Sequence, residues 1–307
     1  MEQRNSAKHF SDESHVNSDD KPDAPDVSGN DAKVELIRGQ IAELTPSGRK
    51  RFFEKFLLAA LGSIPWVGGF ISTMASLKTE AADLRAGDMR TQWLNEHQRK
   101  LAQLAQTLGD ISERFEKLGS QIDERIQSEP YLNLVRRAFR TWDQADTEEK
   151  RKYTSNLVVN AGGTRVCSDD IVRLFIDWLN LYHEAHFAVI KQIFHNPGTS
   201  RYDIWMEIYG QLPREDSAEA DLYKLLVRDL STGGVIRQER ETTMDGHFLR
   251  KHPRRSKGHP PTTMESAFED SKPYVLTALG RQFVHYTMTD TVGRLGTGDD
   301  SANQPAR

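Results

Sequence analysis

The chain has 307 residues, of which 37% are hydrophobic and 28% are charged, and its formal net charge is −4. This length accommodates two domains, and the modest hydrophobic fraction indicates solvated helices and polar tails. A single cysteine, Cys167, excludes an internal disulfide and is typical of a reducing cytoplasm. The N-terminus, MEQRNSAKHFSDES, lacks the apolar core of a signal peptide. We therefore expect a cytoplasmic protein.

The distribution of apolar residues predicts a mainly α-helical protein with five consecutive regions. They are an acidic disordered tail (1–31), an apolar helical hairpin followed by a long coiled-coil helix (32–128), a short helical bundle (130–182), an α+β domain (183–290) and a second disordered tail (291–307). The first tail is rich in Ser, Asp, Asn and Pro, and it has too few apolar side chains to offset the entropy cost of ordering.

The longest uncharged run covers residues 56–77, FLLAALGSIPWVGGFISTMASL. Its length of about 22 residues is enough to cross a bilayer. Proline disrupts a helix interior because it lacks an amide donor and clashes with the preceding turn. We therefore expect two short helices, 52–64 and 69–77, joined by a turn at Pro65 and Trp66.

Such a hairpin either fills a protein core or enters a membrane, and composition does not separate the two. Arg49, Lys50, Arg51 and Lys55 flank the run and suit an anionic cytoplasmic leaflet, so the second alternative predicts a peripheral protein at the inner face of the plasma membrane. The candidate insertion residues are Phe56, Leu57, Ile64, Pro65, Trp66, Val67, Phe70 and Ile71.

A long charged helix is expected from about residue 78 to residue 127, followed by a break at Pro130. Its apolar residues recur at alternating spacings of three and four, which is the a/d pattern of a coiled coil. They are Leu101, Leu104, Leu108, Ile111, Phe115, Leu118 and Ile122. Gly109 and Gly119 lie inside this expected helix and weaken it. The partner of the seam is either a second copy, giving self-association, or another helix of the same chain.

Start and stop signals divide the following bundle into short helices. Asp146 and Glu149 have the spacing of a capping box, and Gly162 with Gly163 marks the end of the helix that they begin. Ser168 is placed to cap the next helix.

The last third contains three helices, near 184–194, 200–209 and 216–232, then a strand at 235–240, a polar loop, a strand near 274–276 and a helix at 277–288. Leu222, Leu225, Leu226 and Leu230 are expected on one face of the third helix. Three helices followed by a two-stranded wing, closing with YVLTALGRQFVHY, resemble a winged-helix domain. The resemblance implies that the third helix lies in the DNA major groove and that the wing contacts the backbone.

The third helix departs from this pattern because Glu215, Asp216, Glu219 and Asp221 surround its start, and carboxylates repel phosphates. On that helix, Lys224 and Arg228 could assist binding. The wing is basic and is either a phosphate-binding loop or a solvated, flexible one. Its cations are Arg250, Lys251, Arg254, Arg255 and Lys257. We expect a domain that binds protein, or itself, rather than one that reads DNA sequence, and any nucleic-acid binding to be weak and carried by the wing.

No catalytic motif is present, so we expect a non-enzymatic protein with no cofactor and no small-molecule substrate. His183 and His186 resemble part of a zinc motif, but zinc proteases space the two histidines four residues apart on one helix face. Here the spacing is three and a third ligand is not evident nearby. We predict no metal site.

Three functions remain open. The apolar run followed by helices is similar to abortive-infection proteins, which defend bacteria against phage, and this implies a membrane-acting effector. The alternatives are a cytoplasmic winged-helix regulator that binds DNA and is dimerised by the coiled coil, and a helical scaffold that joins partners.

Overall fold

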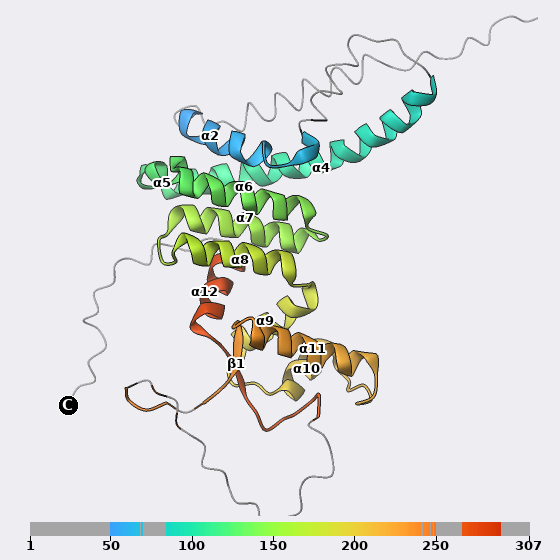
Figure 1. Cartoon of the computed structure of the whole chain (residues 1–307), viewed down its shortest axis with the longest axis vertical. Helices are drawn as coiled ribbons and strands as arrows, with labels where there is room; N and C mark the ends of the chain where they lie inside the picture. The colour runs from blue at the N-terminus through green and yellow to red at the C-terminus, as the bar shows by residue number, and fades with distance from the viewer. Residues whose placement is uncertain are drawn as a thin grey trace, which may run out of the picture.

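The computed structural model describes residues 50–67, 69, 84–240, 242–245, 247, 249 and 266–289, and these are mainly helical. Figure 1 shows a stack of helices above a smaller group of helices and strands. The helical stack consists of α2 (Lys50–Leu61), α4 (Leu84–Leu118), the 3₁₀ turn η1 (Ser120–Ile122), α5 (Asp123–Gln127), α6 (Glu129–Gln144), α7 (Glu148–Gly163), α8 (Asp169–Leu181) and α12 (Ala278–Thr287). The C-terminal module consists of α9 (Glu184–His195), α10 (Arg201–Tyr209), α11 (Ala218–Thr232), β1 (Ile236–Gln238) and β2 (Tyr274–Leu276).

Five of the described helices, α7, α8, α10, α11 and α12, begin where a side-chain oxygen accepts a backbone N–H that has no partner inside the helix. Ser168 caps α8, as the sequence predicted, and Ser200 and Asp203 form a capping box at α10. The prediction for α7 was wrong by one residue, because the Thr147 hydroxyl, rather than Asp146, accepts from the Lys150 N–H. Short polar side chains at the caps therefore set these boundaries.

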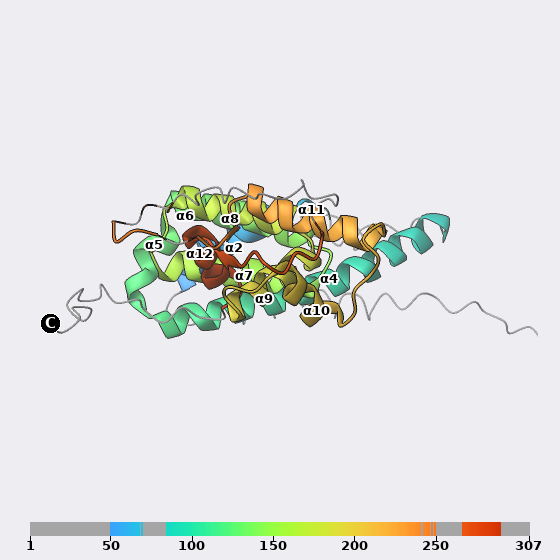
Figure 2. The ribbon, with the colours of Figure 1, turned by 90° about the horizontal axis from the view of Figure 1, so that it is seen from below.

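Helix α7 is the centre of the stack. It contacts α4, α6, α8 and α12, and eleven of its residues are buried. The end view in Figure 2 shows helices on several sides of it. The helix ends at Gly163, as predicted, but its two last glycines also allow close packing: a Cβ at Gly162 would lie 3.0 Å from the Tyr131 hydroxyl, and one at Gly163 would lie 2.8 Å from a Leu118 methyl group.

The long charged helix ends earlier than predicted. Helix α4 passes through Gly109 but stops at Leu118, because Gly119 has a φ of 76°, a left-handed conformation that ends an α-helix. A 3₁₀ turn and the short helix α5 then reverse the chain toward α6 (Figure 1). The first residues of the predicted helix, 78–83, lie outside the described residues.

The predicted coiled-coil seam lies against the same chain. Leu104, Leu108, Ile111 and Phe115 are buried in the core that α4 shares with α7 and its neighbours. Leu101 and Ile122 are also buried and Leu118 is half-buried. The seam therefore makes long-range contacts inside one molecule, and self-association stays a prediction.

The first half of the apolar run is part of the same core. Phe56, Leu57, Ile64 and Val67 are buried, and Pro65 is exposed. Helix α2 ends at Leu61, three residues before the predicted end, and residues 65–67 begin a new helical turn after it.

The turn of the apolar run is fixed by a hydrogen bond. The half-buried Trp66 donates its indole N–H to Asp143 on α6 at 2.6 Å. Phe70 and Ile71 lie outside the described residues. None of the helices that the structure describes has both the length and the apolar character needed to cross a bilayer.

The strands of the C-terminal module form a small antiparallel sheet in which Ile236 pairs with Leu276 and Gln238 with Tyr274. Thr199, between α9 and α10, adds a bridge to Tyr274. After β2, the chain returns to the stack, where α12 packs on α7. The sequence placed α12 with the module, yet its largest contact is with the bundle helix.

Two substitutions on α2 test whether this helix is a core element in solution. Phe56 is fully buried against Phe115 and Phe139, whereas Leu58, two residues later, is 66% exposed. Phe56→Asp places a carboxylate in an apolar core, so we expect a loss of several kcal/mol in unfolding free energy or a failure to fold. Leu58→Asp should change that free energy by less than about 0.5 kcal/mol.

Urea denaturation followed by circular dichroism measures both values. Equal stability of the two variants would show that α2 is not packed in the core in solution, and would favour the membrane alternative.

Candidate functional site

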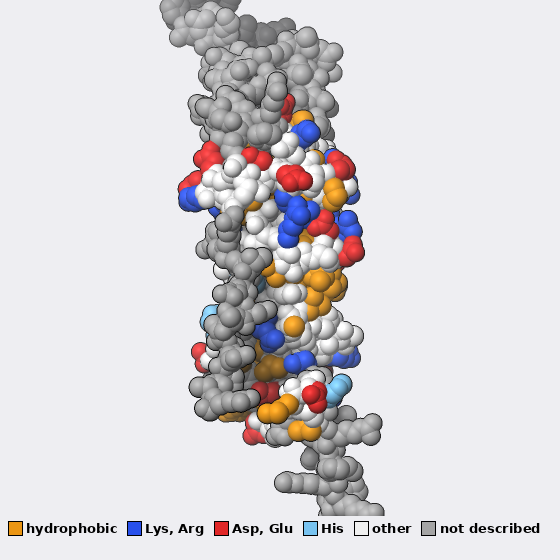
Figure 3. Space-filling model, turned by 90° about the vertical axis from the view of Figure 1, so that its left-hand side faces the viewer, with side chains coloured by type: hydrophobic (Ala, Val, Ile, Leu, Met, Phe, Trp, Pro, Cys, Tyr) orange, Lys and Arg blue, Asp and Glu red, His pale blue; other side chains and the backbone are white. Residues whose placement is uncertain are grey.

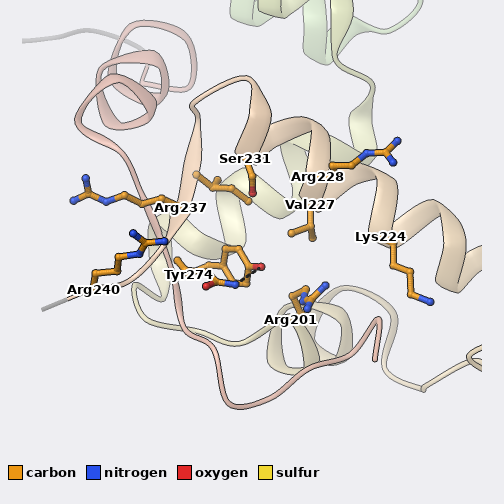
Figure 4. Close-up of a pocket in the computed structure, with 10 residues that line it drawn as sticks. Arg201, Lys224, Val227, Arg228, Ser231, Arg237, Arg240 and Tyr274 are labelled. Atoms are coloured by element: carbon orange, nitrogen blue, oxygen red, sulfur yellow. Dashed lines mark hydrogen bonds between the residues drawn. The ribbon is translucent and has the colours of Figure 1, made fainter. Parts of the chain in front are cut away.

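A cationic hollow lies on the C-terminal module, between α11 and β1 (Figure 4). Its volume is about 440 Å³, within the range of ligand pockets. The described residues that line it are Arg201, Lys224, Val227, Arg228, Ser231, Ile236, Arg237, Gln238, Arg240 and Tyr274. Five of these ten are basic and none is acidic.

The basic residues come from three parts of the module. Lys224 and Arg228 are one turn apart on α11, and Arg237 and Arg240 belong to β1 and the residues after it. Arg201 is the first residue of α10. In Figure 4 they surround Tyr274 and Val227, with Arg237 and Arg240 on one side and Lys224 on the other. Val227 and Ile236 are buried and give the hollow an apolar floor.

Two neighbouring carboxylates contact Lys224 and Arg228 weakly. Glu215 lies 3.8 Å from the Lys224 ammonium, and Asp229 lies 3.9 Å from the Arg228 guanidinium. Both pairs are largely exposed, so their attraction is screened by water. On the face of the molecule in Figure 3, acidic and basic side chains are intermixed over the upper part of the described surface. The hollow concentrates one sign of charge and would attract an anion.

The four carboxylates that the sequence placed in the path of a phosphate do not line the hollow. Glu215 accepts from the Ser266 hydroxyl and from the Ala267 N–H at 3.0 Å. Arg214 donates to both oxygens of Asp216 at 2.8 Å and thereby lowers the pKa of that carboxyl. Two of the four carboxylates are thus engaged by neighbours, and the acidic start of α11 does not occupy this site.

Sequence reasoning identified part of this site. It singled out Lys224 and Arg228, which the structure brings together with three arginines that it missed. Arg201 opens a different helix, and Arg237 and Arg240 follow the turn after α11. The sequence signal for Arg237 and Arg240 was the run RQER, residues 237–240, which directly follows the apolar pair Val235 and Ile236. This run places basic side chains at the start of the wing. The predicted wing residues Arg250, Lys251, Arg254, Arg255 and Lys257 lie outside the described residues.

The two histidines of the zinc-like motif lie elsewhere, at the start of α9. His186 is buried beside Tyr182, and its Nδ1 accepts from the His183 backbone N–H at 3.1 Å. The bond joins the third residue of the helix to its cap, so it stabilises the helix start. Across the described residues, three or more His, Cys, Asp or Glu side chains nowhere gather closely enough to hold a metal ion.

Burial lowers the pKa of His186 below its ordinary value of 6.5, an effect that His183 and Lys150 reinforce and that Asp229 opposes. The unfolded chain therefore takes up this proton first as the pH falls past 6.5. The contribution of His186 to the free energy of unfolding is full above pH 6.5 and decreases as the pH falls through the lower, folded-state pKa.

We expect His186→Gln to reduce the loss of stability between pH 7.5 and pH 5.5, because glutamine keeps an acceptor for the His183 N–H but does not titrate. Chemical denaturation at the two pH values measures the loss. His195→Gln, at an exposed histidine of the same helix, is the matched control. The same pH dependence in wild type and His186→Gln would contradict the assignment.

Comparisons of the chain with protein-family models, with curated proteins and with solved structures gave no match.

Proposed function

We propose that the protein is a non-enzymatic interaction protein whose C-terminal module binds the phosphate backbone of nucleic acid through the cationic hollow. The observation that carries the proposal is that five basic residues, from α10, α11 and the β1 segment, line one hollow that no described carboxylate lines. Lys and Arg that displace counterions from phosphates supply most sequence-independent affinity for nucleic acid.

The arrangement of the module supports a winged-helix assignment. Its elements follow the order helix, bridged residue, helix, helix, strand, strand, and the Thr199–Tyr274 bridge extends the two-stranded sheet on the side of β2. In winged-helix domains the third helix and the wing contact DNA. Here α11 is the third helix and β1 begins the wing. Helix α11 supplies Lys224 and Arg228, and β1 with the residues after it supplies Arg237 and Arg240.

Backbone contacts explain the expected lack of sequence preference. Phosphate contacts position a protein without reading bases. A recognition helix that reads bases offers polar side chains to the major groove, whereas the exposed positions of α11 include Leu222 and Leu225. We therefore propose binding that is indifferent to sequence.

The membrane-acting effector and its role against phage stay predictions. Four of the eight candidate insertion residues are buried in the core, and Phe70 and Ile71 lie outside the described residues. The described contacts of α2 favour a structural role for that part of the run, because its apolar face packs against α5 and α6.

The double variant Arg237→Ala/Arg240→Ala tests the hollow. We expect it to weaken binding to a labelled DNA duplex of arbitrary sequence, because two phosphate contacts are lost. The slope of log K against log salt should fall by about 1.8, since each phosphate contact contributes about 0.9. Fluorescence anisotropy between 50 and 200 mM salt measures the slope; these are roughly the salt limits over which such binding changes strongly.

The matched control is Arg136→Ala/Arg137→Ala, which removes the same charge from α6, where these arginines pair with Glu129 and Asp177. A reduction of equal size in both double variants would indicate a general effect of net charge, and unchanged binding in the hollow variant would contradict the proposal. If neutralising Arg250, Lys251, Arg254 and Arg255 alone abolished binding, the wing rather than the hollow would carry it. A change of sequence preference in Lys224→Ala or Arg228→Ala would instead show a module that reads bases.

A further inference from the structure

The hollow has an inner part that differs from its rim. Arg201 is 9% exposed and Tyr274 is 5% exposed, and both line the hollow (Figure 4). Arg228, Arg237 and Arg240 are exposed at its edge. A ligand that contacts only the edge would meet exposed surface cations, whereas a ligand that enters would reach the buried Arg201.

Arg201 is positioned by the fold around it. It is the first residue of α10, inside the capping box that Ser200 and Asp203 form, and its backbone carbonyl accepts from the buried Tyr223 hydroxyl at 2.7 Å. These bonds fix the start of the helix from which the side chain extends. Tyr274 is fixed in the same way, because its backbone N–H and carbonyl bond to Thr199 and Gly198, at 2.8 and 2.9 Å.

A guanidinium carries five N–H donors in a fixed fork, so Arg201 can bind a facing anion beside the contacts that it already makes. The exposed Glu269 contributes some attraction to Arg201 from outside the lining. Inside the hollow, the neutral polar groups are the Ser231 hydroxyl, the Gln238 amide and the Tyr274 hydroxyl, and Gln238 donates to Tyr274 at 3.4 Å. A hydroxyl that accepts one hydrogen bond keeps its proton to donate to an anion.

The shape and charge of this site favour one chemical form of phosphate. A bridging phosphodiester carries one negative charge and is joined to a nucleoside on each side. We therefore expect a nucleic-acid backbone to cross the rim of the hollow. A phosphate monoester carries close to two charges at pH 7 and three terminal oxygens, which suits a planar guanidinium that donates two parallel bonds. A volume of about 440 Å³ has room for a nucleotide behind that phosphate.

We infer that the hollow binds a phosphate monoester on a nucleotide, with Arg201 and the Tyr274 hydroxyl contacting the phosphate. The inference rests on the proposed function and deepens it: rim cations hold a nucleic-acid strand, and the inner residues select a strand with a phosphorylated end. A free nucleoside monophosphate has the same chemistry and is the second possible source of the ligand.

The experiment compares two labelled single-stranded oligonucleotides of one sequence, with a 5′-phosphate or a 5′-hydroxyl, at pH 7.5. We expect the wild-type protein to prefer the phosphorylated end by about tenfold or more, the effect of one charge-assisted hydrogen bond. The preference should shrink at pH 5.5, below the second pKa of a phosphate monoester, which is about 6.

Arg201→Gln should remove the preference, and Arg201→Lys should restore part of it because the charge returns without the planar fork. Tyr274→Phe is the second variant if Arg201→Gln fails to fold: it removes one hydroxyl and should lower the preference at nearly unchanged thermal stability. Arg237→Ala/Arg240→Ala should weaken binding of both oligonucleotides while keeping their ratio. Arg214→Gln, outside the hollow, is the control.

Equal affinity of the wild type for both oligonucleotides would overturn the inference and leave the proposed function intact. No binding of either oligonucleotide or of the duplex would overturn both. Adenosine monophosphate added as competitor separates the sources of the phosphate. Displacement of the phosphorylated oligonucleotide at a similar concentration would assign the site to a free nucleotide, and displacement only at a far higher concentration would assign it to a strand end.

Discussion

The fold depends on hydrogen bonds from two asparagines of α7 to the C-terminal end of α12. A helix leaves its last carbonyl groups without intrahelical partners. The buried Asn156 donates to the carbonyl of Thr287 at 2.8 Å, and Asn160 donates to that of Tyr286 at 3.0 Å. Arg114 of α4 in turn donates to the Asn156 side-chain oxygen at 2.7 Å. Three helices far apart in sequence therefore meet in one buried network, where each bond is worth more than it is in water.

This network determines how the hollow is held. The C-terminal module lies in the chain between α8 and α12, so both of its ends are attached to the stack. Val235 accepts from the Thr277 N–H at 3.0 Å, and the Thr277 hydroxyl donates to the Gly234 carbonyl at 2.6 Å. A Cβ at residue 280 would lie 2.1 Å from the Val235 carbonyl oxygen, so only glycine permits this approach of α12 to the start of β1. The β1 side of the hollow is thus bonded to the start of α12, and the end of α12 is bonded to α7.

The sequence predicted most helices because their boundaries are local. Capping residues such as Ser168 and stop signals such as Gly163 act within one turn, and a reader of the sequence can place them. The errors occur where distant packing decides. Gly119 was expected inside a helix, but it is the residue at which the chain can turn toward α6. Leu222 and Leu225 were placed on one face of α11 with Leu226 and Leu230, yet the first two are exposed and the other two are buried, because the helix packs through Tyr223, Leu226 and Leu230. Helix α7 lacks one apolar stripe since it is buried on nearly every side.

The distinction between local signals and distant packing also explains which residues of the hollow could be predicted from the sequence. Lys224 and Arg228 share a helix face, so periodicity found them. Arg201 precedes Lys224 by more than twenty residues, and nothing in the sequence brings the two together except the packing of Tyr223 onto the start of α10. The near-neutral net charge conceals the site as well, because acidic and basic side chains are equal in number over residues 34–307. Binding by such a protein follows from where the fold gathers its cations rather than from how many it has. The buried Tyr223, which positions the backbone of Arg201, is therefore part of what builds the hollow, together with the exposed arginines.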